Sequence, residues 1–255
     1  IEAAQGPDTA KYRILGTATN VLNMNKLGLL PTRNYQEGVF EFAEDVSGEY
    51  LEEHHKVKKI ACAQCPIACE QVSAAKQGLY AGAMTGIEYE CLYANGPNCG
   101  ISDMNAIIKM IAVCDSGGQD AMSNGVTVSW TMESFERGVF KKEDFRCAKY
   151  PEGFEPNFGN ADAGVTLSEM IRDREGIGAL LSLGTKRASA QIDRERGTES
   201  YKWAMHVKGL ENPGYDARGL KTFALGLAVG TRGGCNNRTA AYDPDIKGEV
   251  NRFTV

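Results

Sequence analysis

Apolar residues recur at the spacing of an α-helix along most of the chain. The clearest segment runs from 103 to 114, where five positions share one face: Met104, Ile107, Ile108, Ile111 and Ala112. Ser102 or Asp103 can accept hydrogen bonds from the free N–H groups of its first turn. Gly117 and Gly118 follow and favour termination. The pattern therefore predicts a helix with a defined beginning and end.

Three other segments, 12–30, 128–138 and 166–183, show the same period, and Gly176 and Gly178 divide the last of them. Few segments alternate strictly between apolar and polar residues, so we expect little sheet. Glycine and proline are dense at 149–164 and again at 209–219. We take the second stretch as a domain boundary. The prediction is a mostly α protein with a helical domain at 1–205 and the start of a further helical domain at 206–255.

Length and charge narrow the functional classes. A chain of 255 residues can form one large domain or two smaller ones. Its net charge of −5 argues against a nucleic-acid-binding groove, which needs clustered Lys and Arg. No apolar run approaches the roughly 20 residues that cross a bilayer, so we expect no membrane span. The chain begins with Ile1, without a signal peptide, and we expect it to be a piece of a longer protein.

Three of the eight cysteines lie close together in the spacing Cys62-x2-Cys65-x3-Cys69. Thiolates are soft ligands that suit an iron–sulfur cluster or zinc. A cluster would need a fourth ligand from elsewhere, whereas a zinc site could use His54 or His55 just upstream. A buried group of unligated cysteines is the third interpretation. The clustering does not resemble a secreted disulfide scaffold, so we expect a cytoplasmic protein.

The sequence around these cysteines resembles the aldehyde ferredoxin oxidoreductase family. The strings ACAQCPIAC at 61–69 and LLPTRNYQEG at 29–38 are similar to that family's second domain. GIEYECLYANGPNCGISD at 86–103, YDARGLK at 215–221 and GTRGGCNNR at 230–238 follow in the family's order. The resemblance covers about 29–242 and extends into the start of the third domain.

The resemblance implies the helical fold of that family's carboxy-terminal domains and a set of cofactors. These are a metal held by two pterin dithiolenes, tungsten or alternatively molybdenum, and one [4Fe–4S] cluster. Cys62, Cys65 and Cys69 would ligate the cluster and converge on it, with the fourth ligand outside this chain. The implied reaction is oxidation of a small aldehyde to a carboxylate. Electrons would pass to ferredoxin or to an electron-transfer subunit, and the resemblance also allows a homodimer.

Two further motifs are implied to hold the pterin. Asp115-Ser-Gly-Gly118-Gln119-Asp120 resembles the family's Asp-x-x-Gly-Leu-Asp, with Gln119 in place of Leu. Its carboxylates can accept hydrogen bonds from pterin N–H groups. Arg232 and Arg238 would bind the phosphate side, and Arg232 would share a cavity with the aspartates. Without the resemblance, 115–120 would be interpreted as a helix end with solvated aspartates. The segment 230–238 would be interpreted as a basic surface turn.

Glu88 and Glu90 resemble the segment that brings a glutamate to the metal in this family. Counting back from Asp115 favours Glu90, and counting on from Cys69 favours Glu88, so we expect only one of them to reach the site. Such a carboxylate could transfer a proton during oxidation. Asn236 occupies a position where the family often has a histidine, and an amide does not titrate near neutrality.

Two rival interpretations remain open. One is a relative with another substrate, such as the catalytic subunit of benzoyl-CoA reductase. The other is a non-catalytic iron–sulfur module that transfers electrons or stabilises a fold. We expect His206 to be structural and the histidines at 54 and 55 to be a solvated helix end.

Overall fold

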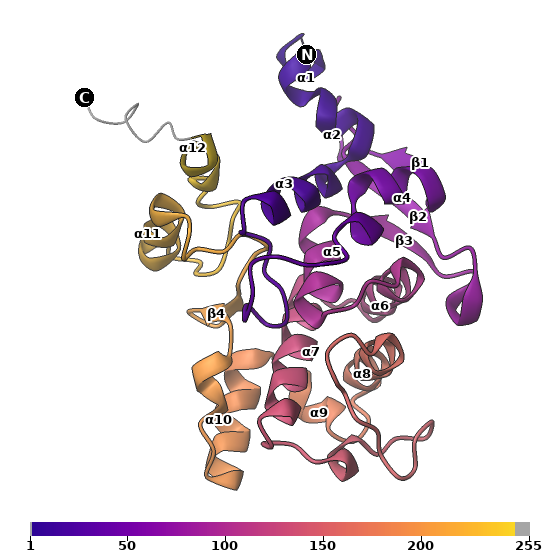
Figure 1. The fold of residues 1–255 in the computed structure, drawn as a ribbon, viewed down its shortest axis with the longest axis vertical. Helices are drawn as coiled ribbons and strands as arrows, with labels where there is room; N and C mark the ends of the chain where they lie inside the picture. The colour runs from indigo at the N-terminus through magenta and orange to yellow at the C-terminus, as the bar shows by residue number, and fades with distance from the viewer. Residues whose placement is uncertain (1, 248–255) are drawn as a thin grey trace.

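A computed structural model describes residues 2–247, which form a largely helical body with a small sheet at one side (Figure 1). The α-helices are α1 Glu2–Gln5, α2 Ala10–Leu15, α3 Asn20–Lys26, α4 Gly48–His54, α5 Tyr89–Asn95, α6 Met104–Gly117, α7 Ala121–Glu136, α8 Ala161–Asp173, α9 Gly178–Leu181, α10 Thr185–Arg196, α11 Lys221–Val229 and α12 Tyr242–Lys247. The strands are β1 Lys56–Ile60, β2 Glu70–Ala74, β3 Met84–Ile87, β4 His206–Val207 and β5 Leu210–Glu211. The mostly α prediction is confirmed.

Helix α6 begins and ends close to where the sequence predicts. The Asp103 side chain caps it by accepting a hydrogen bond from the Asn105 N–H at 2.9 Å. Gly118 ends it in the left-handed conformation, with φ +64°. Helix α7 starts earlier than the apolar pattern predicts, because Asp120 caps it by accepting from the Ser123 N–H at 2.7 Å. Side-chain caps therefore define both helices that border the 115–120 motif.

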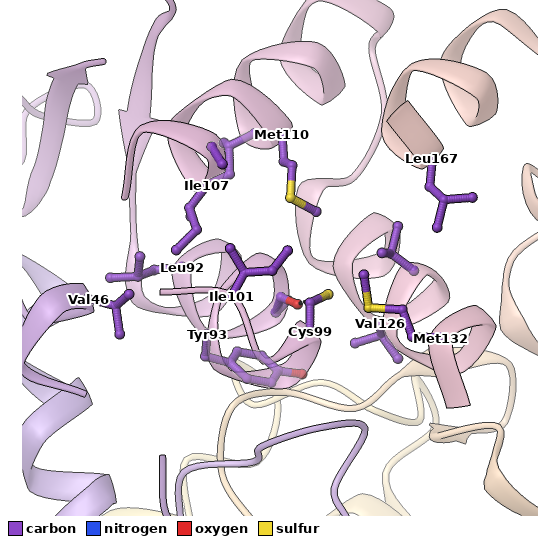
Figure 2. Packing of buried hydrophobic residues seen from close by; sticks show 14 of the residues in the cluster. Val46, Leu92, Tyr93, Cys99, Ile101, Ile107, Met110, Val126, Met132 and Leu167 are labelled. Carbon is purple, nitrogen blue, oxygen red and sulfur yellow. Dashed lines mark hydrogen bonds between the residues drawn. The ribbon is translucent and has the colours of Figure 1, made fainter. Parts of the chain in front are cut away.

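The core is built where α5 packs on α7 and α6 packs on α8. Figure 2 shows side chains from these elements meeting around Ile101, Cys99 and Met110. Helix α6 is buried over most of its surface, so it is an internal helix, not a surface one. Burial of apolar surface at this scale is the main driving force of folding.

Helices α5 and α7 approach unusually closely at Gly125. A Cβ atom there would lie 2.4 Å from the carbonyl carbon of Ala94 and 2.8 Å from its Cβ. These are backbone and near-backbone atoms that cannot rotate away. The absence of a side chain at Gly125 therefore determines how near α7 lies to the helix that carries Glu90.

Strands β1, β2 and β3 form an antiparallel sheet in that order. β2 begins directly after Cys69 and β3 ends directly before Glu88, with Gln71 paired to Ile87. The sheet has no strict alternation of buried and exposed residues in β1, which explains why it is hard to see in the sequence. The cysteine loop is the connection between β1 and β2.

The long helix expected at 12–30 is wrong. Two short helices, α2 and α3, replace it, and the chain breaks between them at Gly16, which has φ +65°. A Cβ at Gly16 would lie 2.5 Å from the carbonyl oxygen of Cys69. The break therefore comes from close packing against the cysteine loop, which local helix periodicity does not report.

The proposed boundary at 209–219 begins in the turn of the β4–β5 hairpin and includes β5. Residues on both sides of it belong to one buried cluster, which includes Tyr89 before it and Phe223 after it. The division into 1–205 and 206–255 stays a prediction, and 248–255 lie outside the described residues. Among residues 2–247, no helix is both long and apolar enough to cross a membrane.

Candidate functional site

A cavity of about 280 Å³ opens where the cysteine loop, the start of α5 and the segment after α11 meet. It brings together four of the residues singled out in the sequence: Cys69, Glu88, Glu90 and Asn236. The rest of its lining is Tyr12, Thr17, Asn20, Ile67, Tyr89, Tyr215, Asn237 and Tyr242. Residues more than 140 positions apart therefore share one site.

Both glutamates line this cavity, and which of them reaches the metal stays a prediction. Glu88 precedes α5 on extended backbone, with φ −125° and ψ 164°, whereas Glu90 lies in the first turn of the helix. The change of backbone conformation between them lets side chains two residues apart face the same space. Burial raises the pKa of Glu88, and the charge of nearby Glu70 adds to the effect.

Glu90 is the most perturbed carboxyl group of the site. Its Oε2 accepts a hydrogen bond from the Gly214 N–H at 2.7 Å. Its Oε1 is buried and has no hydrogen-bond partner among the described residues. Burial raises the pKa of Glu90 to about 7; the Gly214 hydrogen bond opposes this, and the charges of Glu88 and Asp120 add to it. The group is thus poised to gain or lose a proton near neutrality.

The cysteine loop turns back on itself. The Cys65 N–H donates to the Cys62 carbonyl at 3.0 Å, and Gln64 and Ala68 adopt the left-handed conformation with φ +63° and +52°. Cys62 is exposed and the other two thiols are half-buried. The pKa of Cys69 is raised first by burial and then by the charge of Glu88, with smaller contributions from Cys65 and Cys62. The loop is therefore a compact turn that carries all three cysteines.

The zinc interpretation finds no support in the geometry. Within 2–247, no three His, Cys, Asp or Glu side chains are grouped so that they could hold one metal ion. His54 is exposed and stacks on Tyr50, with ring centroids 4.3 Å apart. His55 is buried, contrary to expectation, and its Nδ1 lies 3.0 Å from the Ala74 carbonyl oxygen. A cubane spreads its cysteines over separate irons, so cluster ligation does not need a single meeting point and stays a prediction.

The 115–120 motif covers the last three residues of α6 and the turn that leads into α7. Asp115 is exposed and accepts a hydrogen bond from the Thr85 hydroxyl. Gln119 and Asp120 line a second cavity of about 200 Å³, and the Oε1 atom of Gln119 is buried without a partner among the described residues. Asp120 is near enough to Glu90 for its charge to raise the pKa of that carboxyl group. The motif therefore borders the Glu90 site without lining its cavity.

Arg232 and Arg238 are both exposed, and neither lines the two cavities described above. Their guanidinium groups have no hydrogen bond or ion pair within 2–247. The structure thus does not place Arg232 in one cavity with Asp115 and Asp120, and the shared site stays a prediction. Two exposed, unpaired guanidinium groups beside glycines remain suited to an anionic ligand.

Sequence reasoning missed the aromatic wall of the cavity. Tyr215 stacks on Tyr242 with ring centroids 4.3 Å apart, and the Tyr215 hydroxyl accepts from the Asn20 amide at 3.2 Å. Tyr215 and Asn237 lie inside the matched strings at 215–221 and 230–238, which could have pointed to them. Nothing in the sequence distinguishes Tyr12 or Tyr242 from core tyrosines. His206 is half-buried in β4, with Nδ1 unpartnered among the described residues.

Comparison with known proteins shows which family this chain is similar to. The family model described as "Aldehyde ferredoxin oxidoreductase, domains 2 & 3" matches residues 2–255. The tungsten-containing aldehyde ferredoxin oxidoreductase of Pyrococcus abyssi is 38% identical over 233 residues, covering 91% of this chain and 36% of the relative. The chain thus spans about a third of the length of the curated relatives it matches.

Two other matches show how widely the fold is used. The WOR-like subunit of an aliphatic sulfonate oxidoreductase from Pyrococcus furiosus is 32% identical over 215 residues, covering 83% of this chain and 33% of the relative. The active-site complex BamBC of benzoyl coenzyme A reductase, solved with 1,5-dienoyl-CoA, aligns with a TM-score of 0.64 at 16% identity. That alignment covers 86% of this chain and 31% of the solved one, and at this identity it shows a shared fold.

Proposed function

This chain belongs to the aldehyde ferredoxin oxidoreductase family, and from that premise we propose that it supplies part of the active site of an enzyme that oxidises an aldehyde to a carboxylate. The observation that carries the proposal is the single cavity lined by Cys69, Glu88, Glu90 and Asn236. It places a thiol suited to an iron–sulfur cluster beside a carboxyl group suited to proton transfer. An oxidation that releases electrons and protons needs both.

The cofactor in this proposal is a tungsten–bis-pterin, with molybdenum as the alternative metal, and the chain offers side chains that are chemically suited to it. Asp115 and Asp120 offer carboxylates, and Gln119 offers a buried acceptor without a partner among the described residues. The unpaired guanidinium groups of Arg232 and Arg238 suit the phosphate side. When bound, the metal and its dithiolenes supply the two-electron redox chemistry. The chain's own residues bind the cofactor and orient the substrate beside it.

In this proposal Cys62, Cys65 and Cys69 would ligate a [4Fe–4S] cluster. The compact loop, in which the Cys65 N–H donates to the Cys62 carbonyl, supports this assignment. Electrons would leave through the cluster to ferredoxin or to an electron-transfer subunit. The fourth ligand would come from outside the chain.

Glu90 is the proton-transfer residue in this proposal. With a pKa of about 7, its carboxyl group is present in both protonation states near neutrality, which is the condition for efficient general acid–base catalysis. Oε2 is occupied by the Gly214 N–H, so the unpartnered Oε1 is the atom that takes up or releases the proton. Asn236 can orient a substrate oxygen but cannot exchange a proton in this range.

The test is Glu90→Gln in the full-length enzyme, with Glu88→Gln as the matched variant from the same cavity. Glu90→Gln should retain tungsten and iron while turnover falls by roughly 10²-fold or more. The loss should fall on kcat far more than on KM. Full activity in Glu90→Gln with loss in Glu88→Gln would move the role to Glu88. Full activity in both would refute the carboxylate mechanism.

A relative with another substrate is the second candidate. It is favoured by Asn236, which lacks the titratable ring, and by the 32% identity to a subunit named for aliphatic sulfonate oxidation. Turnover assays with aldehydes and sulfonates would decide between them. Metal analysis addresses the non-catalytic module, because such a module would contain iron and sulfide without tungsten or molybdenum.

A further inference from the structure

Residues 212–214 form a short strap against α5, the helix that carries Glu90. Three consecutive carbonyl groups of this strap accept hydrogen bonds from tyrosine hydroxyls. Tyr93 donates to the Asn212 oxygen, Tyr35 to the Pro213 oxygen at 2.6 Å, and Tyr89 to the Gly214 oxygen. All three tyrosines are buried. Buried carbonyls need such partners, so these bonds determine where the strap lies.

The strap also packs directly on two of these rings. A Cβ at Gly214 would lie 2.6 Å from Cδ1 of Tyr93 and 2.8 Å from Cε1 of Tyr89. Only glycine permits this approach. The peptide N–H of the same Gly214 donates to Oε2 of Glu90 at 2.7 Å. Tyr89, Glu90 and Tyr93 all lie in α5. The two tyrosines hold Gly214 in place, and the N–H of Gly214 is the hydrogen-bond donor to Glu90.

We propose that Tyr89 and Tyr93 are positioning residues for Glu90: they hold the strap so that the Gly214 N–H stays on Oε2 and proton exchange is confined to Oε1. The proposal rests on the assignment of Glu90 as the proton-transfer group. It goes further by naming residues that set the properties of that group through the backbone. The hydroxyl groups of both tyrosines donate to strap carbonyls, so in this proposal they act on Glu90 through the backbone.

The strap supplies the hydrogen bond that opposes the other electrostatic effects on the pKa of Glu90. The charged groups that face Glu90 are Glu88 before α5 and Asp120 before α7, and both favour its protonated form. Tyr35, Tyr215 and Tyr242 also face it; burial raises the pKa of each, so they remain uncharged near neutrality. The Gly214 N–H is thus the main interaction that favours the carboxylate. Burial raises the pKa of Tyr89 and Tyr93 too, so their hydroxyls stay donors.

The experiment uses Tyr89→Phe, Tyr93→Phe and the double variant in the full-length enzyme. Two readouts report on Glu90: the pH dependence of kcat, and infrared titration of its carboxyl C=O band, identified by its loss in Glu90→Gln. Each single variant should raise the pKa of Glu90 by about one unit, because a weakened N–H bond no longer favours the charged form. The double variant should raise it further. Tyr80→Phe, which removes a hydroxyl bonded to distant Asp162 at 3.2 Å, should leave it unchanged.

An unchanged Glu90 titration in folded Tyr89→Phe and Tyr93→Phe would overturn the proposal, even if turnover fell. If a variant at α5 fails to fold, Tyr35→Phe tests the same strap from outside that helix and should shift the pKa in the same direction. The infrared readout needs no turnover, which separates the two hypotheses. Full activity in Glu90→Gln would refute the proposed catalytic role, whereas a shifted band in the tyrosine variants would still show that the strap controls Glu90.

Discussion

Replacing Gly125 by alanine should destabilise the protein and displace Glu90 at the same time. The new Cβ would lie 2.4 Å from the Ala94 carbonyl carbon and 2.6 Å from its oxygen, so α5 and α7 must separate. Overpacking of this kind costs about 1–3 kcal/mol, and a backbone clash belongs near the upper end. Alanine returns up to about 1 kcal/mol through its higher helix propensity. We therefore expect a net loss of about 2 kcal/mol in the free energy of unfolding.

Urea unfolding of the wild-type and variant chains measures this loss as a lower midpoint at an unchanged slope. Gly117→Ala is the comparison variant, since its Cβ would meet Cγ of Arg172 at 2.7 Å, a side-chain atom that a rotamer change can displace, and not a backbone atom. Because only a side chain must move, this variant should lose less stability than Gly125→Ala. Equal stability of the two variants would refute the argument from close helix approach. In the full-length enzyme, Gly125→Ala should also lower turnover with metal content retained.

Four other outcomes follow from the site. Because burial raises the pKa of Glu90 from 4.5 to about 7, the folded chain binds its proton more tightly, and stability should fall by about 3 kcal/mol as pH rises through that window. Glu90→Gln should remove this difference between unfolding at pH 4.5 and pH 8. Serine at any clustered cysteine should reduce iron content, whereas Cys147→Ser should not; equal iron in all would contradict cluster ligation at 62, 65 and 69. Asp120→Ala should lose about 1 kcal/mol of α7 capping together with bound pterin, while Asp120→Ser should keep the cap and lose only pterin, as measured by unfolding and cofactor assay. Asn236→His should add an ionisation near neutrality to the pH profile of kcat, and an unchanged profile would place residue 236 away from the proton path.

Local signals were sufficient for much of the helical fold. The start of α6 follows from Asp103, a side chain that bonds the next turn, and its end follows from paired glycines. These are effects within a few residues, so the sequence contains them. The break at Gly16 depends on the Cys69 carbonyl, more than fifty positions away, and no periodicity within 12–30 reports it.

The candidate site also has features that the sequence predicts and features that depend on distant contacts. Cys69, Glu88, Glu90 and Asn236 were chosen by type and motif, and the fold brings them to one cavity. Both glutamates line the cavity because α5 begins between them, at Tyr89. The sequence does not predict the first residue of a helix that precisely. The three strap tyrosines are buried, and no side-chain pattern in the sequence distinguishes them from other core tyrosines. Their proposed role depends on hydrogen bonds to backbone carbonyls, which a side-chain pattern does not encode.

The β2–β3 ladder also determines where the chain can change length. One end of the ladder adjoins Cys69 and Glu88, and the other leads into the turn at 75–83. An added residue within either strand would shift the pairing by about 3.3 Å and reverse the direction of the following side chains, separating the thiol from the carboxylate. An addition beside Gly78, which has open space around it, would leave every pair in place. A short reporter peptide inserted after Gln77 should therefore label the protein while leaving the pairing beside Cys69 and Glu88 intact.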